Sequence, residues 1–361
     1  MTRSRPHVHL YRAYVLRLLA LLLIAPALHA QTGEEMAAKT ASTSIGQLAP
    51  IATLDTMDGK RIDLSDFYGR KPVYLKFWAT WCVPCRQQMP HFQAAFRKYE
   101  QQIQTVAVNL GLNDDPADVR RFLEQTKLAM PVAIDAGGEL ATAFNVIVTP
   151  MHVLIDADGR IAYIGHAADE RLDRALEKLS HSTPTGKTAT QAQRRHLGAT
   201  RAAARVGDTV TPFPIATGSQ SRSFGPDAKR STVIAFITEW CESYLRESRP
   251  EASEACRKTR EALTLASRKL GDDVQWLTVA SRVWTSEAGL EAYGKTHRIA
   301  TPLVLDASGE IFQRFGIMEV PTVIIVDTHG RIQQRFDGYD PKLARALESL
   351  PRAAQSTVSS R

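Results

Sequence analysis

The stretch Trp81-Cys82-Val83-Pro84-Cys85 decides the fold of this chain. The preceding run, Lys71 to Trp78, is apolar and rich in β-branched and aromatic residues, which predicts a buried strand. Helix-forming residues follow from Cys85 to Tyr99. A strand, a Cys-x-x-Cys pair and a helix in this order are typical of a redox-active dithiol. A zinc knuckle needs a second ligand pair at metal spacing, and the neighbouring sequence has none.

The spacing of the two cysteines suits reversible thiol-disulfide exchange. Backbone N–H groups and the positive dipole end at a helix N-terminus favour the thiolate of Cys82, which is therefore the expected nucleophile. Residues three apart share a helix face, so Cys85 is expected to resolve the mixed disulfide. Pro84 fits the first helical turn, and Trp81 is expected to flank the sulfurs. The alternative is a buried structural cysteine pair or a fortuitous zinc half-site.

Residues beyond this motif extend it into a family pattern. The motif resembles that of the TlpA/ResA-type thioredoxin-like thiol-disulfide oxidoreductases, and the resemblance covers about residues 45 to 179. Three further segments match the family, namely Gly46-Gln47-Leu48-Ala49-Pro50, Val106-Ala107-Val108-Asn109 and Val148-Thr149-Pro150. The resemblance implies that Pro150 is cis and that Thr149 offers its backbone to the substrate. Because only about 5% of X-Pro bonds are cis, this bond is a sharp structural test.

Three positions depart from that pattern. Lys76 lies where thioredoxin has a buried acid; it either tunes the dithiol or packs its stem while its amine reaches solvent. The glutamate that ResA-type proteins carry after the next strand is absent here, unless Asp114 or Asp115 substitutes for it. His152 follows the proline loop and is expected to be a strand residue without a catalytic role, with a position facing the sulfurs as the alternative.

The order of the remaining elements predicts an α/β fold. Pro90 is expected to kink the helix after the motif, because proline removes a backbone hydrogen bond. The pattern predicts strands at 105–109, 131–135, 150–155 and 160–164, and helices at 115–127, 139–144 and 169–179. This is the order of a thioredoxin fold, a central mixed sheet flanked by helices, with an insertion before its third strand.

The second half of the chain repeats the first. Trp81-Cys82 recurs as Trp240-Cys241. Seven residues recur 171 positions later, as Pro302, Asp306, Glu310, Phe315, Pro321, Asp327 and Gly330. We therefore expect two tandem thioredoxin-like folds, with an insertion in the second copy after Pro250.

The second copy of the motif lacks its resolving thiol, because Tyr244 stands in that position. The second domain is therefore degenerate as a dithiol site. Cys256 would lie about 22 Å from Cys241 along one straight helix, too far to bridge. If Pro250 breaks that helix, the two can meet. We predict a Cys241–Cys256 disulfide, structural or redox-active, with two unpaired cysteines as the alternative.

The N-terminus predicts export. Residues 1–30 combine a basic start, a short apolar run and small residues near Ala30, as in a secretory signal peptide, although an uncleaved membrane anchor stays open. A periplasm-like compartment also suits the cysteines. The net charge of +7 is scattered, so no nucleic-acid partner is expected. We divide the chain into a signal peptide (1–30), a flexible tether (31–44), a thioredoxin-like domain with the dithiol (45–180), a linker (181–206), a degenerate thioredoxin-like domain (207–352) and a tail (353–361).

The leading hypothesis is an exported disulfide reductase that acts on disulfide-containing proteins and needs no cofactor. The resemblance implies that a transmembrane electron donor of the DsbD/CcdA type recharges it. A disulfide oxidase or isomerase would use the same site in the other direction. A third hypothesis is a copper-handling or adaptor protein with Cys82, Cys85 and His152 as ligands, although no dedicated metal site is expected. A peroxiredoxin is disfavoured, because the two cysteines of the first motif form a Cys-x-x-Cys pair that follows a tryptophan.

Overall fold

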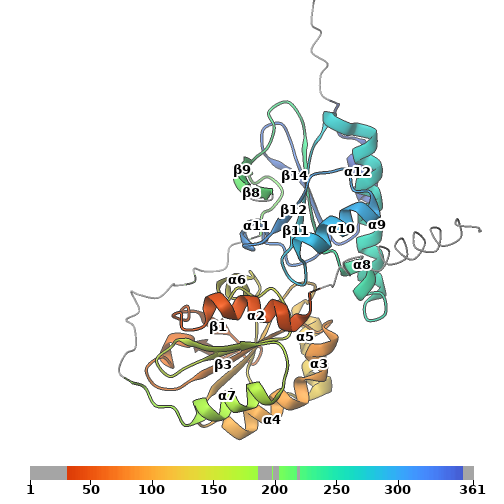
Figure 1. Ribbon diagram of the computed structural model, residues 1–361. Coiled ribbons are helices and arrows are strands. Elements are labelled where there is room, and N and C mark those ends of the chain that lie inside the picture. The colour runs from red at the N-terminus through yellow and green to blue at the C-terminus, as the bar shows by residue number, and fades with distance from the viewer. Residues whose placement is uncertain (1–30, 186–196, 198–202, 218–219, 353–361) are drawn as a thin grey trace, which may run out of the picture. The chain divides into compact units, whose positions relative to one another are not determined.

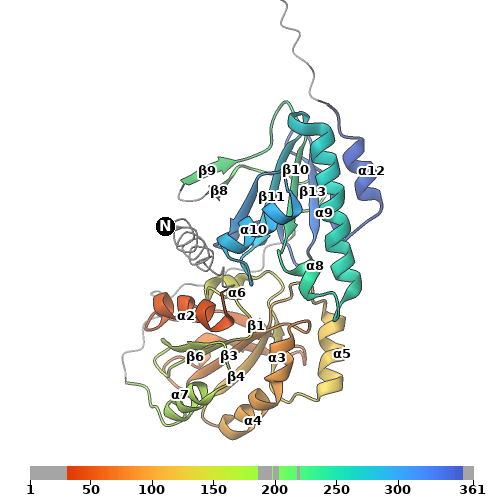
Figure 2. The same cartoon turned by 45° about the vertical axis from the view of Figure 1, so that its right-hand side comes forward.

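The computed structural model describes residues 31–185, 197, 203–217 and 220–352. The predicted signal peptide, most of the predicted linker and the predicted tail lie outside these ranges. The described residues from Thr32 onward belong to one compact unit, which contains both predicted domains. Figures 1 and 2 show the two domains, each built on its own sheet.

The first domain is built on a five-stranded mixed sheet of order β5-β4-β3-β6-β7. The strands β3, β4 and β5 are parallel, while β6 and β7 run antiparallel to their neighbours. The strands β1 Thr53–Asp55 and β2 Arg61–Asp63 pair with each other in a separate sheet. The five-stranded sheet contains β3 Val73–Trp78, β4 Gln104–Asn109, β5 Val132–Ile134, β6 Met151–Ile155 and β7 Ile161–Gly165. Its helices are α2 Gly33–Ser44, α3 Val83–Gln87, α4 Met89–Tyr99, α5 Pro116–Thr126, α6 Glu139–Ala143 and α7 Glu170–Ser180.

The central strand β3 is buried along its whole length, as its composition predicts. Because strand side chains alternate between faces, Leu75 and Phe77 pack into one hydrophobic cluster while Tyr74 and Trp78 pack into the other. Figures 1 and 2 show α4 and α7 side by side on one face of this sheet, and α6 on the other. The face covered by α4 and α7 is the one that carries the dithiol.

The prediction of a flexible tether at 31–44 is wrong, because α2 occupies Gly33–Ser44. Thr32 and Glu35 form a capping box that satisfies the first N–H groups of this helix. Met36 and Ala37 are buried, and both pack against Val148 beside the proline loop. The small and polar residues of this segment are typical of a flexible tether. They form a helix here because the buried side of the helix packs against the first domain.

The helix after the motif is broken rather than only kinked. It divides into α3 and α4 at Gln88, whose φ and ψ are −89° and −3°. Pro90 lies in the first turn of α4, where its missing N–H costs no hydrogen bond. Consequently the macrodipole at Cys82 comes from one short helix, and direct hydrogen bonds gain weight in stabilising its sulfur.

The second domain repeats this topology with the order β12-β11-β10-β13-β14. The strands β8 Phe213–Thr217 and β9 Gln220–Phe224 pair with each other in a separate sheet. The main sheet contains β10 Thr232–Ile237, β11 Gln275–Ser281, β12 Leu303–Asp306, β13 Thr322–Val326 and β14 Ile332–Asp337. Its helices are α8 Cys241–Tyr244, α9 Pro250–Leu270, α10 Glu287–His297, α11 Glu310–Phe315 and α12 Lys342–Glu348. The predicted fold class of two tandem thioredoxin-like folds is confirmed. The insertion lengthens α9, which has 21 residues where α4 has 11.

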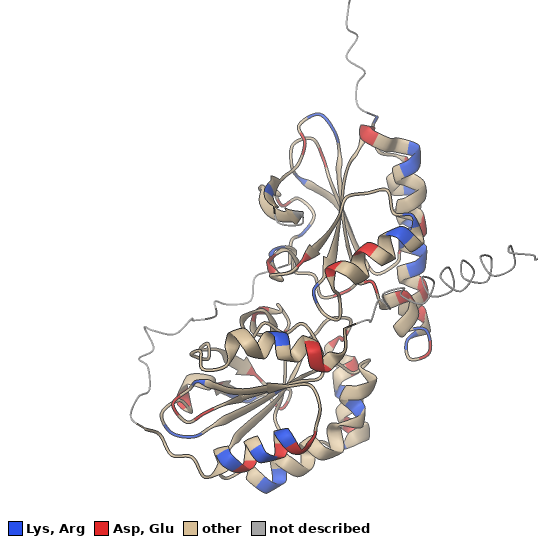
Figure 3. Ribbon diagram, in the orientation of Figure 1, with Lys and Arg blue, Asp and Glu red and all other residues tan. Residues whose placement is uncertain are grey.

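Charged residues do not segregate on the described surface. Figure 3 shows Lys and Arg interspersed with Asp and Glu along helices such as α7 and α9. Several of these charges pair within one helix, as Arg257 does with Glu254 and Glu261. Such exposed pairs contribute little to stability, and they leave both signs mixed on these helices.

Candidate active site

Cys82 and Cys85 form a disulfide at the junction between β3 and α3, with their Cα atoms 5.2 Å apart. Cys82 is the N-cap residue of α3, and its Sγ accepts a hydrogen bond of 3.2 Å from the backbone N–H of Cys85. Pro84 lies in the first turn, where it leaves this N–H free to point at the sulfur. Once the disulfide is reduced, that bond stabilises a thiolate on Cys82.

The proline loop has the conformation that the family resemblance implies. The Thr149–Pro150 peptide bond is cis, and so is the Val320–Pro321 bond at the equivalent place in the second domain. Thr149 is fully buried, and its hydroxyl oxygen accepts a hydrogen bond from the indole N–H of Trp284. The proposed backbone role of Thr149 in substrate binding stays a prediction.

Lys76 is fully buried, so the alternative that its amine reaches solvent is wrong. Its side chain is on the same face of β3 as Tyr74 and Trp78, and its Nζ lies 5.2 Å from the ring centroid of Phe92. Among the described residues the amine has no hydrogen-bond partner. Desolvation by burial therefore lowers the pKa of Lys76 from 10.5 to about 7, so the amine is largely neutral in alkaline solution.

His152 belongs to a buried hydrogen-bond chain. Its Nε2 donates to Oε1 of Gln88 over 2.8 Å, and its Nδ1 accepts from the hydroxyl of Tyr74 over 2.7 Å. The amide of Gln88 in turn donates to the carbonyl of His166, whose Nδ1 donates to the carbonyl of Pro150. Burial and the nearby Lys76 hold the pKa of His152 well below 6.5, so the imidazole is neutral. This chain ties the break between α3 and α4 to the proline loop.

Asp114, one of the two candidates for the missing family acid, lies next to the motif. Its carboxylate accepts hydrogen bonds from the backbone N–H and hydroxyl of Thr80 and from the amide of Asn109. Burial raises the pKa of Asp114, while these donors and the guanidinium of Arg249 oppose that rise. Asp115 instead caps α5, by accepting from the N–H of Asp118. Of the two, Asp114 is therefore the one that can influence the dithiol.

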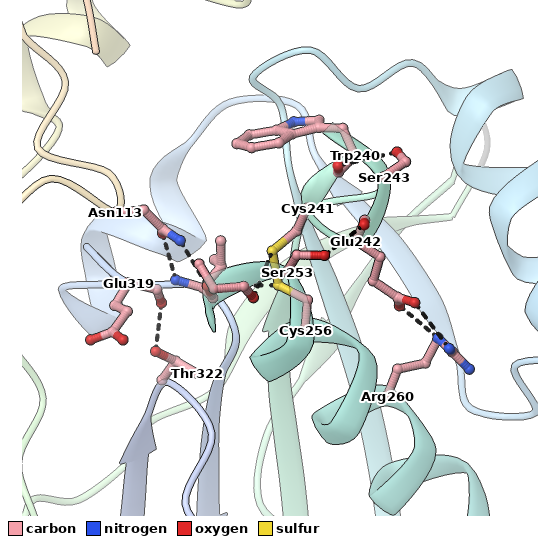
Figure 4. The surroundings of a disulfide bond; sticks show 12 residues. Asn113, Trp240, Cys241, Glu242, Ser243, Ser253, Cys256, Arg260, Glu319 and Thr322 are labelled. Atoms are coloured by element: carbon pink, nitrogen blue, oxygen red, sulfur yellow. Dashed lines mark hydrogen bonds and ion pairs between the residues drawn. A yellow bond between two sulfur atoms is a disulfide. The ribbon is translucent and has the colours of Figure 1, made fainter. Parts of the chain in front are cut away.

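The second disulfide joins Cys241 to Cys256, with Cα atoms 6.2 Å apart. Figure 4 shows how the chain permits it: Cys241 opens α8, and the second turn of α9 brings Cys256 back beside it. Pro250 starts α9 and so provides the predicted break in the helix. Cys256 Sγ lies 3.8 Å from the carbonyl oxygen of Val320, which precedes the second cis-proline. The bridge thus occupies the place that a dithiol holds in the first domain.

The sequence did not reveal that the second domain contributes to the surroundings of the dithiol. The ring of Trp81 lies 4.7 Å from that of Trp240 and 6.3 Å from that of Tyr244, between centroids. The hydroxyl oxygen of Tyr244 accepts a hydrogen bond from the backbone N–H of Val83. The only signal in the sequence is the recurrence of Trp-Cys, which marks corresponding positions but does not say that they meet.

Two further findings concern the described residues only. Within them, no group of three or more His, Cys, Asp or Glu side chains is placed to hold a metal ion. None of the helices in the described ranges is long and apolar enough to cross a bilayer. Both ring nitrogens of His152, which the copper hypothesis invokes, are engaged by Tyr74 and Gln88.

A reversible Cys-x-x-Cys disulfide at the end of a buried strand, beside a cis-proline loop, can exchange electrons pairwise with another disulfide. The fold and the site together define a thioredoxin-like protein-disulfide oxidoreductase.

Comparison with known proteins agrees with this class. The sequence profile of the AhpC/TSA family matches residues 45–164. Thiol-disulfide oxidoreductase ResA of Bacillus cereus (strain ATCC 10987 / NRS 248) is 34% identical over 167 residues, which are 45% of this chain and 95% of that protein. ResA of Bacillus subtilis (strain 168) is 34% identical over 124 residues, 34% of this chain and 68% of the relative. The chain belongs to the ResA family of thiol-disulfide oxidoreductases.

Among solved structures, StoA from Bacillus subtilis is 26% identical to this chain, with a TM-score of 0.32. The alignment covers 36% of this chain and 97% of StoA.

Proposed function

We propose that this protein is an exported reductase of disulfides in other proteins. The observation that carries the proposal is the hydrogen bond from the Cys85 N–H to Cys82 Sγ, because it favours the reduced, thiolate form of the attacking residue. The basic, then apolar, N-terminal sequence supports export through a signal peptide, and we place the protein in the periplasm.

The reaction proceeds in two exchanges. The Cys82 thiolate attacks one sulfur of a substrate disulfide, forms a mixed disulfide and expels the other substrate sulfur as a thiolate. Cys85 then attacks Cys82 Sγ, releases the second substrate thiolate and closes the Cys82–Cys85 disulfide. The substrate gains two electrons and the enzyme loses two. The disulfide seen in the structure is thus the spent form, which an external dithiol must reduce.

We propose that Lys76 accepts the proton that the resolving step releases. Cys85 must lose its proton before it can attack, and it is completely buried. Lys76 is buried on the same side of β3, and its pKa of about 7 lets its neutral amine accept a proton at neutral pH. We assign this role to Lys76 in place of the acid that thioredoxin carries there.

The family resemblance supports a transmembrane electron donor of the DsbD/CcdA type as the recharging partner. The same dithiol would serve an oxidase if an oxidant recharged it instead, whereas an isomerase would start from the reduced dithiol and regain it when the substrate disulfide re-forms. Direction is set by the reduction potential of the pair relative to the compartment. The redox state in the cell therefore separates the two functions.

The test is to trap thiols by acid in cells that export the protein, alkylate them and quantify Cys82 and Cys85 by peptide mass spectrometry. We expect most of the Cys82–Cys85 pair to be reduced, and to become oxidised when the membrane electron donor is deleted. A pair that is mostly oxidised in donor-containing cells contradicts a reductase and assigns the protein as an oxidase. The redox state of Cys241 and Cys256 is quantified in the same digest. This pair is the internal reference, because it is a bridge without a resolving cysteine three residues from the first.

A further inference from the structure

We propose that the second domain is a tethered occupant of the surface around Cys82, and that it must leave this surface before a protein substrate can reach the dithiol. The inference concerns access to the sulfur and therefore holds for either direction of electron flow. It rests on four sets of contacts between residues 45–180 and 207–352.

Aromatic residues from the degenerate motif cover the functional one. Trp240 stacks on Trp81, with ring planes inclined by 30°, and the ring of Tyr244 meets Trp81 edge-on. Tyr244 replaces the resolving cysteine of the second motif, yet its hydroxyl accepts a hydrogen bond of 2.9 Å from the N–H of Val83. The N–H that follows the nucleophile is thus already occupied.

A loop of each domain forms hydrogen bonds with the proline loop of the other domain. Asn113, after β4, donates from its side chain to the carbonyl of Val320 and accepts from the N–H of the same residue. Trp284, after β11, donates its backbone N–H to the carbonyl of Ile147 and its indole N–H to the hydroxyl of Thr149. Each domain therefore holds the cis-proline loop of the other. Pairing both backbone groups of Val320 imitates the way an added strand binds an edge.

An arginine anchors this contact near the motif. Arg249 of the second domain forms an ion pair of 2.8 Å with the buried carboxylate of Asp114 and one of 3.2 Å with Asp118. It also donates to the hydroxyl of Thr80, two residues before Cys82. A buried carboxylate that has one cation as its partner binds that cation selectively, because losing it leaves an uncompensated charge.

The nucleophile beside these contacts is almost inaccessible in the closed arrangement. Cys82 is 1% exposed and Thr149 is fully buried, whereas a folded substrate must bring its own sulfur to Cys82. If the closed arrangement dominates, the apparent rate with a large substrate is the intrinsic rate multiplied by the open fraction. A small thiol reagent needs a smaller opening, so the two kinds of probe respond differently to undocking.

The test uses the full chain with Cys85→Ala, which leaves Cys82 as its one thiol outside the Cys241–Cys256 disulfide. The rate at which Cys82 is labelled is measured with N-ethylmaleimide and with a polyethylene-glycol maleimide. The rate with the polyethylene-glycol maleimide is divided by the rate with N-ethylmaleimide, and this ratio is normalised to that of the same protein in urea. We expect a low ratio for this parent. Adding Tyr244→Ala or Asn113→Gly should raise it at least about fivefold, because each weakens the closed state.

Arg257→Ala is the matched control, because Arg257 also lies in the second domain but forms its ion pairs along α9. The labelling-rate ratio of this variant should stay within about twofold of that of the parent. Asn113 has a φ of 53°, which glycine adopts freely. Asn113→Gly therefore tests the contact between the domains even if Tyr244→Ala fails to fold. A parent ratio equal to that in urea, or an unchanged ratio in the folded variants, would overturn the proposal. Neither outcome depends on whether the enzyme reduces or oxidises its substrates.

Discussion

Replacing Cys82 by serine is expected to reduce disulfide exchange by at least about three orders of magnitude, to the rate without enzyme, because loss of a nucleophile commonly has an effect of this size. A serine hydroxyl is not ionised at neutral pH and cannot form a disulfide, so neither exchange can occur. The measurement is the reduction of a fluorescent derivative of glutathione disulfide in the presence of dithiothreitol. This substrate is smaller than a folded protein, so it needs a smaller opening of the second domain.

The matched control is the double variant Cys241→Ser/Cys256→Ser, which removes the other bridge of the chain. It should retain most of the exchange, because Cys82 and Cys85 keep their own geometry within the first domain. Equal loss in both variants would mean that the second bridge, rather than Cys82–Cys85 alone, is required for the reaction.

Lys76→Met is expected to stabilise the protein by about 5 kcal/mol at pH 6, because each pKa unit corresponds to roughly 1.4 kcal/mol and methionine of similar length needs no hydrogen-bond partner. Burial lowers the pKa of Lys76 from 10.5 to about 7, so the unfolded chain binds a proton that the folded protein binds weakly. The wild-type cost is complete below about pH 7 and shrinks as the pH rises toward 10.5. The advantage of the variant should therefore fade in the same window.

Urea denaturation of both proteins at pH 6, 7.5 and 9 checks this prediction. Lys178→Met is the control, because Lys178 is an exposed residue of α7 and its replacement should change stability by no more than about 0.5 kcal/mol. A Lys76→Met variant that is less stable than the wild type at pH 6 would show that the amine is charged and paired in the folded protein.

Local patterns predicted most of the first domain and the dithiol. The apolar run before the motif could only be a strand covered on both faces, and the two cysteines then had to meet on one helical turn. The 171-residue repeat transferred that fold to the second half, and the longer segment after Pro250 located the extra turns of α9. These features depend on residues close together in the sequence, or on the repeat.

The features that the sequence did not predict depend on tertiary contacts. The segment of α2 was predicted to be a tether, because its residues are mostly small and polar. Its few buried residues pack against a surface that the local sequence does not indicate. At the break, Gln88 forms hydrogen bonds with His152 of β6 and with His166, which follows β7, and both residues are far along the chain. The ion pair of Arg249 depends on the buried carboxylate of Asp114, which lies far from it in the sequence.

The central claim is that Cys82 attacks the substrate disulfide and Cys85 displaces it. The direct measurement is to mix the Cys85→Ala protein with a disulfide-bonded peptide and map the covalent products by mass spectrometry. The account predicts a persistent peptide adduct on Cys82, which the wild type releases and which Cys82→Ser never forms. An adduct on another residue, or one that the wild type retains as long as the variant does, would contradict it.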